Sequence, residues 1–141
     1  MKKFLVGVDG SLEAGAAVRK AAELAKAFGA SLTLVYVAPP NPTYAADTWA
    51  AELKRADVIE HGYVPALLLQ AELECRPSGV VADTTSRTGR AAETLAEMAE
   101  SGGFDLVVVG HRGRGAVQRA LLGSVADRLV QICPRPVLVV R

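Results

Sequence analysis

Hydrophobic residues form five short, nearly uninterrupted runs along this chain. Apolar runs of roughly four to eight residues, bounded by glycine, proline or polar residues, are typical of strands buried on both faces of a sheet. They predict strands over residues 3–8, 31–37, 79–87, 105–110 and 135–141. The run over 79–87 is the weakest of the five.

Between these runs, apolar positions recur at helical spacing. Helices are expected from the DGS turn at 9–11 to about Phe28, over 90–100 and over 124–133. The first helix should bury Ala17, Ala21, Leu24, Ala25 and Phe28, with Gly29 as its stop, and the second Ala92, Leu95, Ala96 and Ala99. Residues 38–47 read as a proline-rich loop, and 48–76 as mostly helical with a break near Gly62 and Pro65.

Strands that alternate with helices predict a doubly wound, Rossmann-like α/β fold. We expect a five-stranded parallel sheet in the order 3-2-1-4-5, with helices on both faces. A chain of 141 residues fits one domain, 1–141.

Composition narrows the classes of function. A net charge of +1 argues against a general nucleic-acid binder, and no run reaches the ~20 apolar residues of a membrane span. Cys75 and Cys133 lie in no CxxC or metal-ligand spacing, so plain thiols in a reducing cytoplasm are expected, with no metal site. Asp9 interrupts the first apolar run, so no export signal is expected.

The connection after 105–110 is rich in glycine and arginine. Ligands of open parallel sheets bind where the strand order reverses, here between the first and fourth strands. Gly110 and Gly113 let backbone amides approach a ligand, and free amides of the helix that opens at Gly123-Ser124 attract phosphate. Ser124 either caps this helix together with Asp127 or donates to a phosphate. The nearby arginines either add charge or stay solvated: Arg112, Arg114 and Arg119.

Two residues at the ends of the first and second strands are further candidates. Asp9 can accept hydrogen bonds from ribose or a base, or it can cap the first helix through the amides of Ser11 or Leu12. Val37 can offer backbone groups to an adenine edge, or it belongs to the core. His111 either touches a ligand or is an ordinary loop residue.

The pattern Gly110-x2-Gly113-x9-Gly123-Ser124 resembles the ATP-binding signature of the universal stress protein family. FLVGVDGS, FDLVVVGHRGRG, LLGSVADRLV and CPRPVLVVR are similar to the family's first strand and turn, fourth strand, last helix and terminal strand. The resemblance implies ATP, with or without Mg²⁺, with Asp9 on the ribose and Gly7 and Val37 beside the adenine. Around the phosphates it implies Val109, Gly110, Arg112, Gly113, Gly123, Ser124 and Val125.

Two positions depart from the family pattern. Some ATP-binding relatives have Ser or Thr where this chain has Ala126, and many relatives have His where it has Arg112. These two differences leave open whether the chain prefers a triphosphate and whether it hydrolyses ATP slowly. The resemblance implies a dimeric stress-response module that binds a nucleotide, with protein partners unspecified. The alternatives are a slow ATPase or nucleotidyl-transfer enzyme, and a dimeric adaptor without nucleotide. Near the loop only Asp9 and Asp127 are acidic and no GxxxxGK[ST] motif is present, so binding without catalytic residues is favoured.

The family also implies a homodimer formed through the terminal strand, 136–141. An uncovered apolar edge strand invites pairing with another chain. The competing interpretation is that Pro136 and Arg141 protect that edge.

Overall fold

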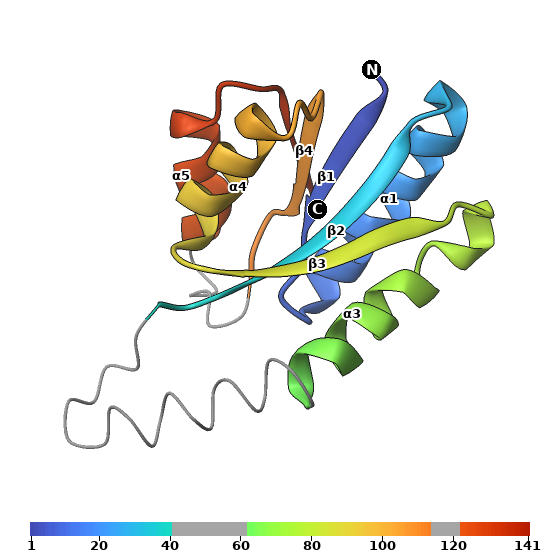
Figure 1. The fold of residues 1–141 in the computed structure, drawn as a ribbon, viewed down its shortest axis with the longest axis horizontal. Coiled ribbons are helices and arrows are strands. Elements are labelled where there is room, and N and C mark those ends of the chain that lie inside the picture. The colour runs from blue at the N-terminus through green and yellow to red at the C-terminus, as the bar shows by residue number, and fades with distance from the viewer. Residues whose placement is uncertain (41–61, 114–121) are drawn as a thin grey trace.

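The computed structural model of the chain describes residues 1–40, 62–113 and 122–141. Five parallel strands form one sheet in the order β3-β2-β1-β4-β5, which confirms the predicted topology (Figure 1). The strands are β1 (Lys3–Gly7), β2 (Ser31–Ala38), β3 (Ala82–Thr88), β4 (Leu106–Gly110) and β5 (Val137–Val140).

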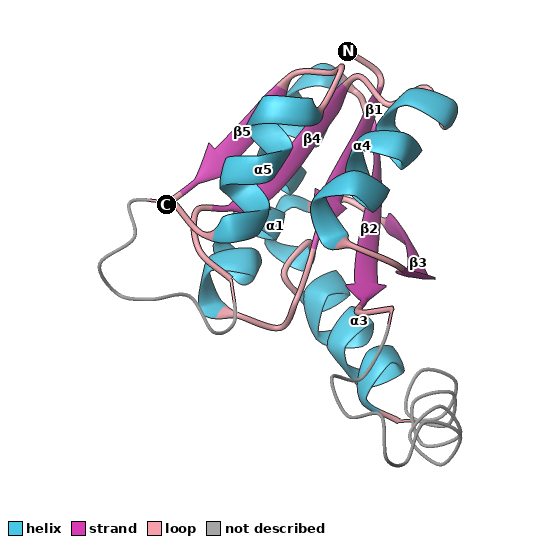
Figure 2. Cartoon of the chain, turned by 90° about the vertical axis from the view of Figure 1, so that its left-hand side faces the viewer, coloured by secondary structure: helices cyan, strands magenta, loops and turns pink. Residues whose placement is uncertain are grey.

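Helices cover both faces of this sheet. They are α1 (Leu12–Phe28) and α3 (Tyr63–Leu73) on one face, and α4 (Ala91–Ser101) and α5 (Ser124–Ile132) on the other (Figure 2). None of the helices in the described ranges is long and apolar enough to cross a membrane.

Two aliphatic cores follow from the alternation of side chains along each strand. Phe4 and Val6 of β1 point into the core beneath α1 and α3, whereas Leu5 between them points into the core beneath α4 and α5. All three side chains are fully buried. Such double burial explains why the strands read as continuous apolar runs rather than as an alternating pattern.

The predicted inward faces are largely confirmed. The four residues expected to face inward from α4 are all buried, and so are Ala17, Ala21 and Ala25 of α1, with Leu24 partly buried against them. Phe28 was predicted to be buried, and this is wrong, because its side chain is 57% exposed. It is the last residue of α1, where the ring of Phe4 covers it edge-on at 6.1 Å between centroids.

Helix and strand ends follow local backbone chemistry. Gly29 ends α1 in the left-handed conformation (φ 65°), as predicted. The third strand begins at Ala82 instead of residue 79, because a 3-10 turn at Arg76–Ser78 and a left-handed Gly79 precede it. Pro65 lies in the first turn of α3, where a missing N–H costs nothing. The predicted loop over 38–47 and helical pattern over 48–61 fall mainly outside the described residues.

Candidate functional site

A cleft opens at the carboxyl ends of the strands, where the chain leaves β1 for one face and β4 for the other. β1 and β4 are neighbours in register, with Val6 opposite Val108. The cleft has a volume of about 80 Å³. It brings together eight of the ten predicted site residues: Gly7, Asp9, Val37, Val109, Gly110, Arg112, Gly113 and Val125.

One half of the cleft is an apolar slot centred on Gly7. A Cβ atom built on Gly7 would lie 2.9 Å from Leu95 Cδ1 and 3.3 Å from Val109 Cγ1, so a side chain here would close the slot. Val37 and Ala91 complete its lining. An apolar slot with few polar groups suits a flat, mostly apolar ring.

Sequence reasoning missed Ala91 and Leu95 as site residues. Both were assigned to the helix that follows the third strand, and Leu95 is indeed buried in the core. The available signal was topological, because Ala91 opens α4 just beyond the carboxyl end of β3 and so belongs to the ligand-binding edge of the sheet.

Asp9 lies between the two loops that form the polar half of the cleft. Its Oδ1 accepts a hydrogen bond from the amide of Ser11 at 2.9 Å, which is one of the two capping contacts considered from the sequence. Ser11 is itself the N-cap of α1, and its Oγ accepts from the amide of Ala14 at 3.1 Å. A Cβ built on Gly113 would lie 2.5 Å from Asp9 Oδ2, so the carboxylate lies directly over the Gly113 backbone.

Backbone hydrogen bonds fix the loop that follows β4. The amide of His111 donates to the carbonyl oxygen of Val140 at 2.8 Å, and its own carbonyl oxygen accepts from the amide of Gly123 at 2.6 Å. This loop therefore joins the end of β5 to the start of α5. A Cβ on Gly110 would lie 2.8 Å from the Glu13 carbonyl, so packing against α1 already requires glycine there.

The start of α5 differs from the expectation. Gly123 is the N-cap residue, in an extended conformation, and its carbonyl oxygen accepts from the amide of Asp127 at 2.9 Å. Of the two roles considered for Ser124, capping is excluded, because Ser124 is already the first helical residue. Its side chain is exposed, and its hydroxyl has no hydrogen-bond partner among the described residues. Gly123 and Ser124 do not line the cleft itself but adjoin it, since a Cβ on Gly123 would lie 3.0 Å from Arg112 Cα.

Among the described residues, the charged groups that line the cleft are Asp9 and Arg112. Arg112 Nε donates to His111 Nε2 at 3.0 Å, which makes that nitrogen an acceptor. The buried Nδ1 of His111 has no hydrogen-bond partner among the described residues. Arg114 and Arg119 lie outside the described residues. Across the described ranges, no group of three or more His, Cys, Asp or Glu side chains could hold a metal ion.

Comparisons with known proteins give matches along the whole chain. The model of the universal stress protein family matches residues 1–141. A universal stress protein of Mycobacterium tuberculosis is 38% identical over 152 residues, which cover 97% of this chain and 47% of that protein. The chain thus spans about half the length of the mycobacterial relatives it matches.

Solved structures show the same fold. Universal stress protein UspA from Lactobacillus plantarum superposes with a TM-score of 0.86 at 25% identity, covering 99% of this chain and 97% of that one. A universal stress protein crystallised in complex with cAMP superposes with a TM-score of 0.76 at 27% identity, covering 99% and 97%.

Proposed function

Because the chain belongs to the universal stress protein family, we propose that it binds an adenine nucleotide, ATP above all, in the cleft between the ends of β1 and β4. The observation that carries this proposal is the pairing of an apolar slot at Gly7 with a carboxylate and a glycine loop at Asp9 and Gly113. The cAMP complex of a family structure supports the same ligand class.

Each part of the cleft is assigned to one part of the nucleotide. The adenine enters the slot between Val37, Leu95 and Val109, and the ribose hydroxyls donate to Asp9. The phosphates lie along Gly110–Gly113 and over the first amides of α5, where Ser124 offers its hydroxyl. Val125 flanks them. Unpaired amides and the helix dipole favour negative charge at that point.

A nucleotide needs more room than the cleft now offers. Ligand sites usually measure about 300–1,000 Å³, against about 80 Å³ here. Binding must therefore displace side chains at the mouth, and Arg112 is placed to turn from His111 toward a phosphate. A guanidinium binds phosphate oxygens well because of its planar set of donors.

We infer that the site serves regulation rather than turnover. Asp9 is the one carboxylate among the described residues that line the cleft, and the amide of Ser11 already holds it. Mg²⁺ would accompany ATP chiefly through the phosphate oxygens. Regulation would pass through a cytoplasmic homodimer of this one domain, 1–141, formed along the half-exposed edge strand β5 and its flanks, 136–141.

Nucleotide content provides the first test. The purified protein is denatured with acid, and the supernatant is separated by ion exchange with ultraviolet detection. A near-stoichiometric ATP or AMP peak is expected. If none appears, titration calorimetry of the protein with ATP and Mg²⁺ decides, and no binding at millimolar ATP would refute the proposal.

A matched pair of glycine variants tests the placement. Gly113→Val should abolish ATP binding while the fold survives, because the new side chain collides with Asp9 and fills the phosphate loop. Gly15→Val is the control, since Gly15 does not line the cleft and has room for a side chain. Equal ATP affinities of the two variants would contradict the assignment.

A further inference from the structure

A second and larger cavity lies between α1 and α3, on the opposite side of α1 from Gly110. Its volume is about 640 Å³, within the range of roughly 300–1,000 Å³ that small-molecule sites occupy. Its apolar lining includes Val18, Leu67 and Ala71. We call it the α1–α3 trough. The proposed nucleotide contacts leave it unused, although Ser11 lines both the trough and the cleft.

Gly15 widens the trough from the first turn of α1. A Cβ atom built there would lie 3.6 Å from both Arg19 Nη1 and Glu74 Oε1, which is ordinary van der Waals contact. Packing therefore leaves room for alanine, which is the better helix former. Glycine at this position leaves a methyl-sized space between α1 and the Arg19–Glu74 pair.

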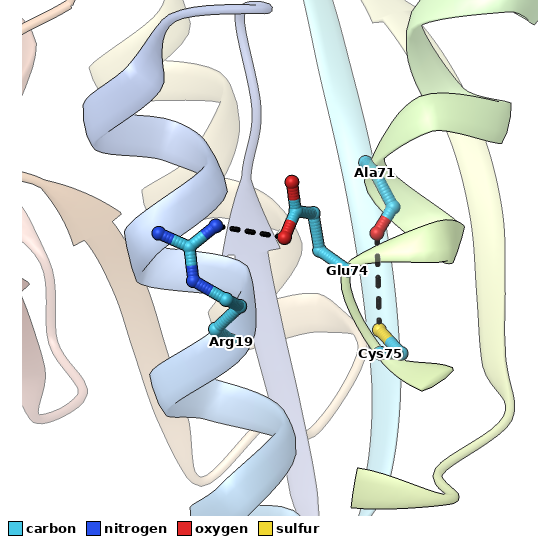
Figure 3. Close-up of polar contacts among 4 residues, drawn as sticks. All are labelled: Arg19, Ala71, Glu74 and Cys75. Atoms are coloured by element: carbon cyan, nitrogen blue, oxygen red, sulfur yellow. Dashed lines mark hydrogen bonds and ion pairs between the residues drawn. The ribbon is translucent and has the colours of Figure 1, made fainter. Parts of the chain in front are cut away.

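The charges of the trough are balanced. Arg19 and Glu74 are the charged residues of its described lining, and they point toward one another from α1 and the end of α3 (Figure 3). Arg19 Nη1 lies 2.7 Å from Glu74 Oε2, with the side chains 50% and 28% exposed. Each charge is thus already compensated, and a charged ligand would find no unpaired partner.

Hydrogen-bonding groups are nevertheless present. Gln70 lies one helical turn before Glu74, so its amide, which both donates and accepts, faces the same side of α3. Ser11 and Tyr63 border the trough as well. This lining suits a ligand with an apolar body and an uncharged polar group.

We propose that the α1–α3 trough is a second ligand site, which binds an uncharged amphipathic small molecule such as a medium-chain alcohol or amide. The apolar body lies over Ala66 and Leu67, beneath which the buried Val18 and Ala71 form the floor. Its polar group lies beside Gln70 and the Arg19–Glu74 pair. The trough and the nucleotide cleft share Val8, Ser11 and Ala14. Gln70 and the Arg19–Glu74 pair line only the trough, so variants there test the trough separately.

Fluorescence of N-phenyl-1-naphthylamine, an uncharged apolar probe, tests the site. The wild-type protein should bind the probe with micromolar affinity, and decanamide should displace it. Gly15→Leu should weaken probe binding roughly tenfold or more by filling the trough, and Gly15→Ala should do so to a lesser degree. Ala27→Leu, at an exposed position of the same helix, is the matched control and should bind normally.

Either of two results would overturn the proposal: no binding by the wild-type protein, or unchanged binding by both Gly15 variants with circular dichroism showing them folded. ATP affinity of Gly15→Leu should stay at the wild-type value, which separates the two sites. A parallel loss of ATP and probe binding would show a distorted α1 and would also overturn the assignment.

The charge balance has its own test. Glu74→Gln leaves Arg19 without its partner, so decanoate should compete roughly tenfold better than it does in the wild type. Arg19→Met leaves Glu74 unpaired and should favour decylamine in the same way. If both variants keep the wild-type order of competitors, the ion pair does not set the ligand class, and the uncharged assignment is wrong.

Discussion

Asp9 is the proposed ribose ligand, and backbone contacts orient its carboxylate. The amide of Ser11 holds Oδ1, and Oδ2 lies over Gly113. Asp9→Ala should therefore weaken adenosine, AMP and ATP alike, by about 10- to 100-fold, the usual range for one hydrogen bond to a charged acceptor. Titration calorimetry with the three ligands measures this. A loss confined to ATP would instead place the carboxylate near the phosphates.

The two cysteines differ in reactivity because they differ in surroundings. Cys75 is 1% exposed. Burial first, and then the negative charges of Glu72 and Glu74, raise the pKa of its thiol above 9.0. Cys133 is half-buried at the end of α5. Because the thiolate is the reactive form, one thiol per chain should react rapidly with a disulfide reagent at pH 8.

The second thiol should appear only after unfolding in denaturant. Cys133→Ser supplies the control, because this variant should show almost no fast-reacting thiol. Rapid reaction of that variant would mean that Cys75 is accessible in the native protein.

At the level of elements, Asp105 joins the beginnings of β1 and β4. Its Oδ2 accepts from the amides of Lys2 at 2.7 Å and Lys3 at 3.0 Å. These two hydrogen bonds lower the carboxyl pKa below its usual 3.8. A lowered pKa stabilises the fold above the unfolded-state pKa, and this contribution disappears as the pH falls through the folded-state value.

Asp105→Asn should accordingly be less stable than the wild type at pH 7, with the difference shrinking as the pH falls below about 3.8. Urea unfolding at pH 7, 4 and 3 measures this difference. If the difference in free energy of unfolding between Asp105→Asn and the wild type stays constant with pH, the charge of Asp105 does not contribute to stability.

The spacing of apolar residues predicted the helices and strands well wherever burial in one of the two cores determines which positions are apolar. The runs of β1 and β4 and the alanine stripe of α4 are of this kind. Local geometry was harder to predict. Phe28 keeps the helical spacing but lies at the end of α1, and Ser124 has the chemistry of a cap although Gly123 takes that position. The spacing of apolar residues does not show at which residue the buried face of a helix ends. It also does not show which of two adjacent residues takes the N-cap position.

At the level of the whole molecule, strand order followed from the alternation of elements, and with it the position of the cleft. The α1–α3 trough could not be predicted in this way. Its size depends on the distance between two helices far apart in the sequence, and Gly15 by itself is an unremarkable glycine in a helical pattern. The contact of Arg19 with Glu74 in the folded chain shows how the helices are spaced.

The edge strand offers a test of assembly. The carbonyl oxygens of Pro136 and Val140 accept from the β4 side, so the peptide groups of Val137 and Val139 face away from the sheet. Val139→Pro removes an outward donor without breaking a bond to β4. It should weaken the proposed homodimer roughly tenfold or more, as measured by sedimentation velocity. Val139→Thr keeps the amide and should remain dimeric, and equal behaviour of the two variants would exclude pairing along β5.

The backbone of His111 links two distant parts of the molecule through two hydrogen bonds. Its amide proton is held by Val140 at the sheet edge, and its carbonyl oxygen receives Gly123 at the start of α5. When β5 separates from β4, that proton becomes free to exchange with solvent, and the loop of the cleft loses its anchor in the same event. The exchange rate of this single amide therefore reports on both fraying of the edge strand and loosening of the ligand site.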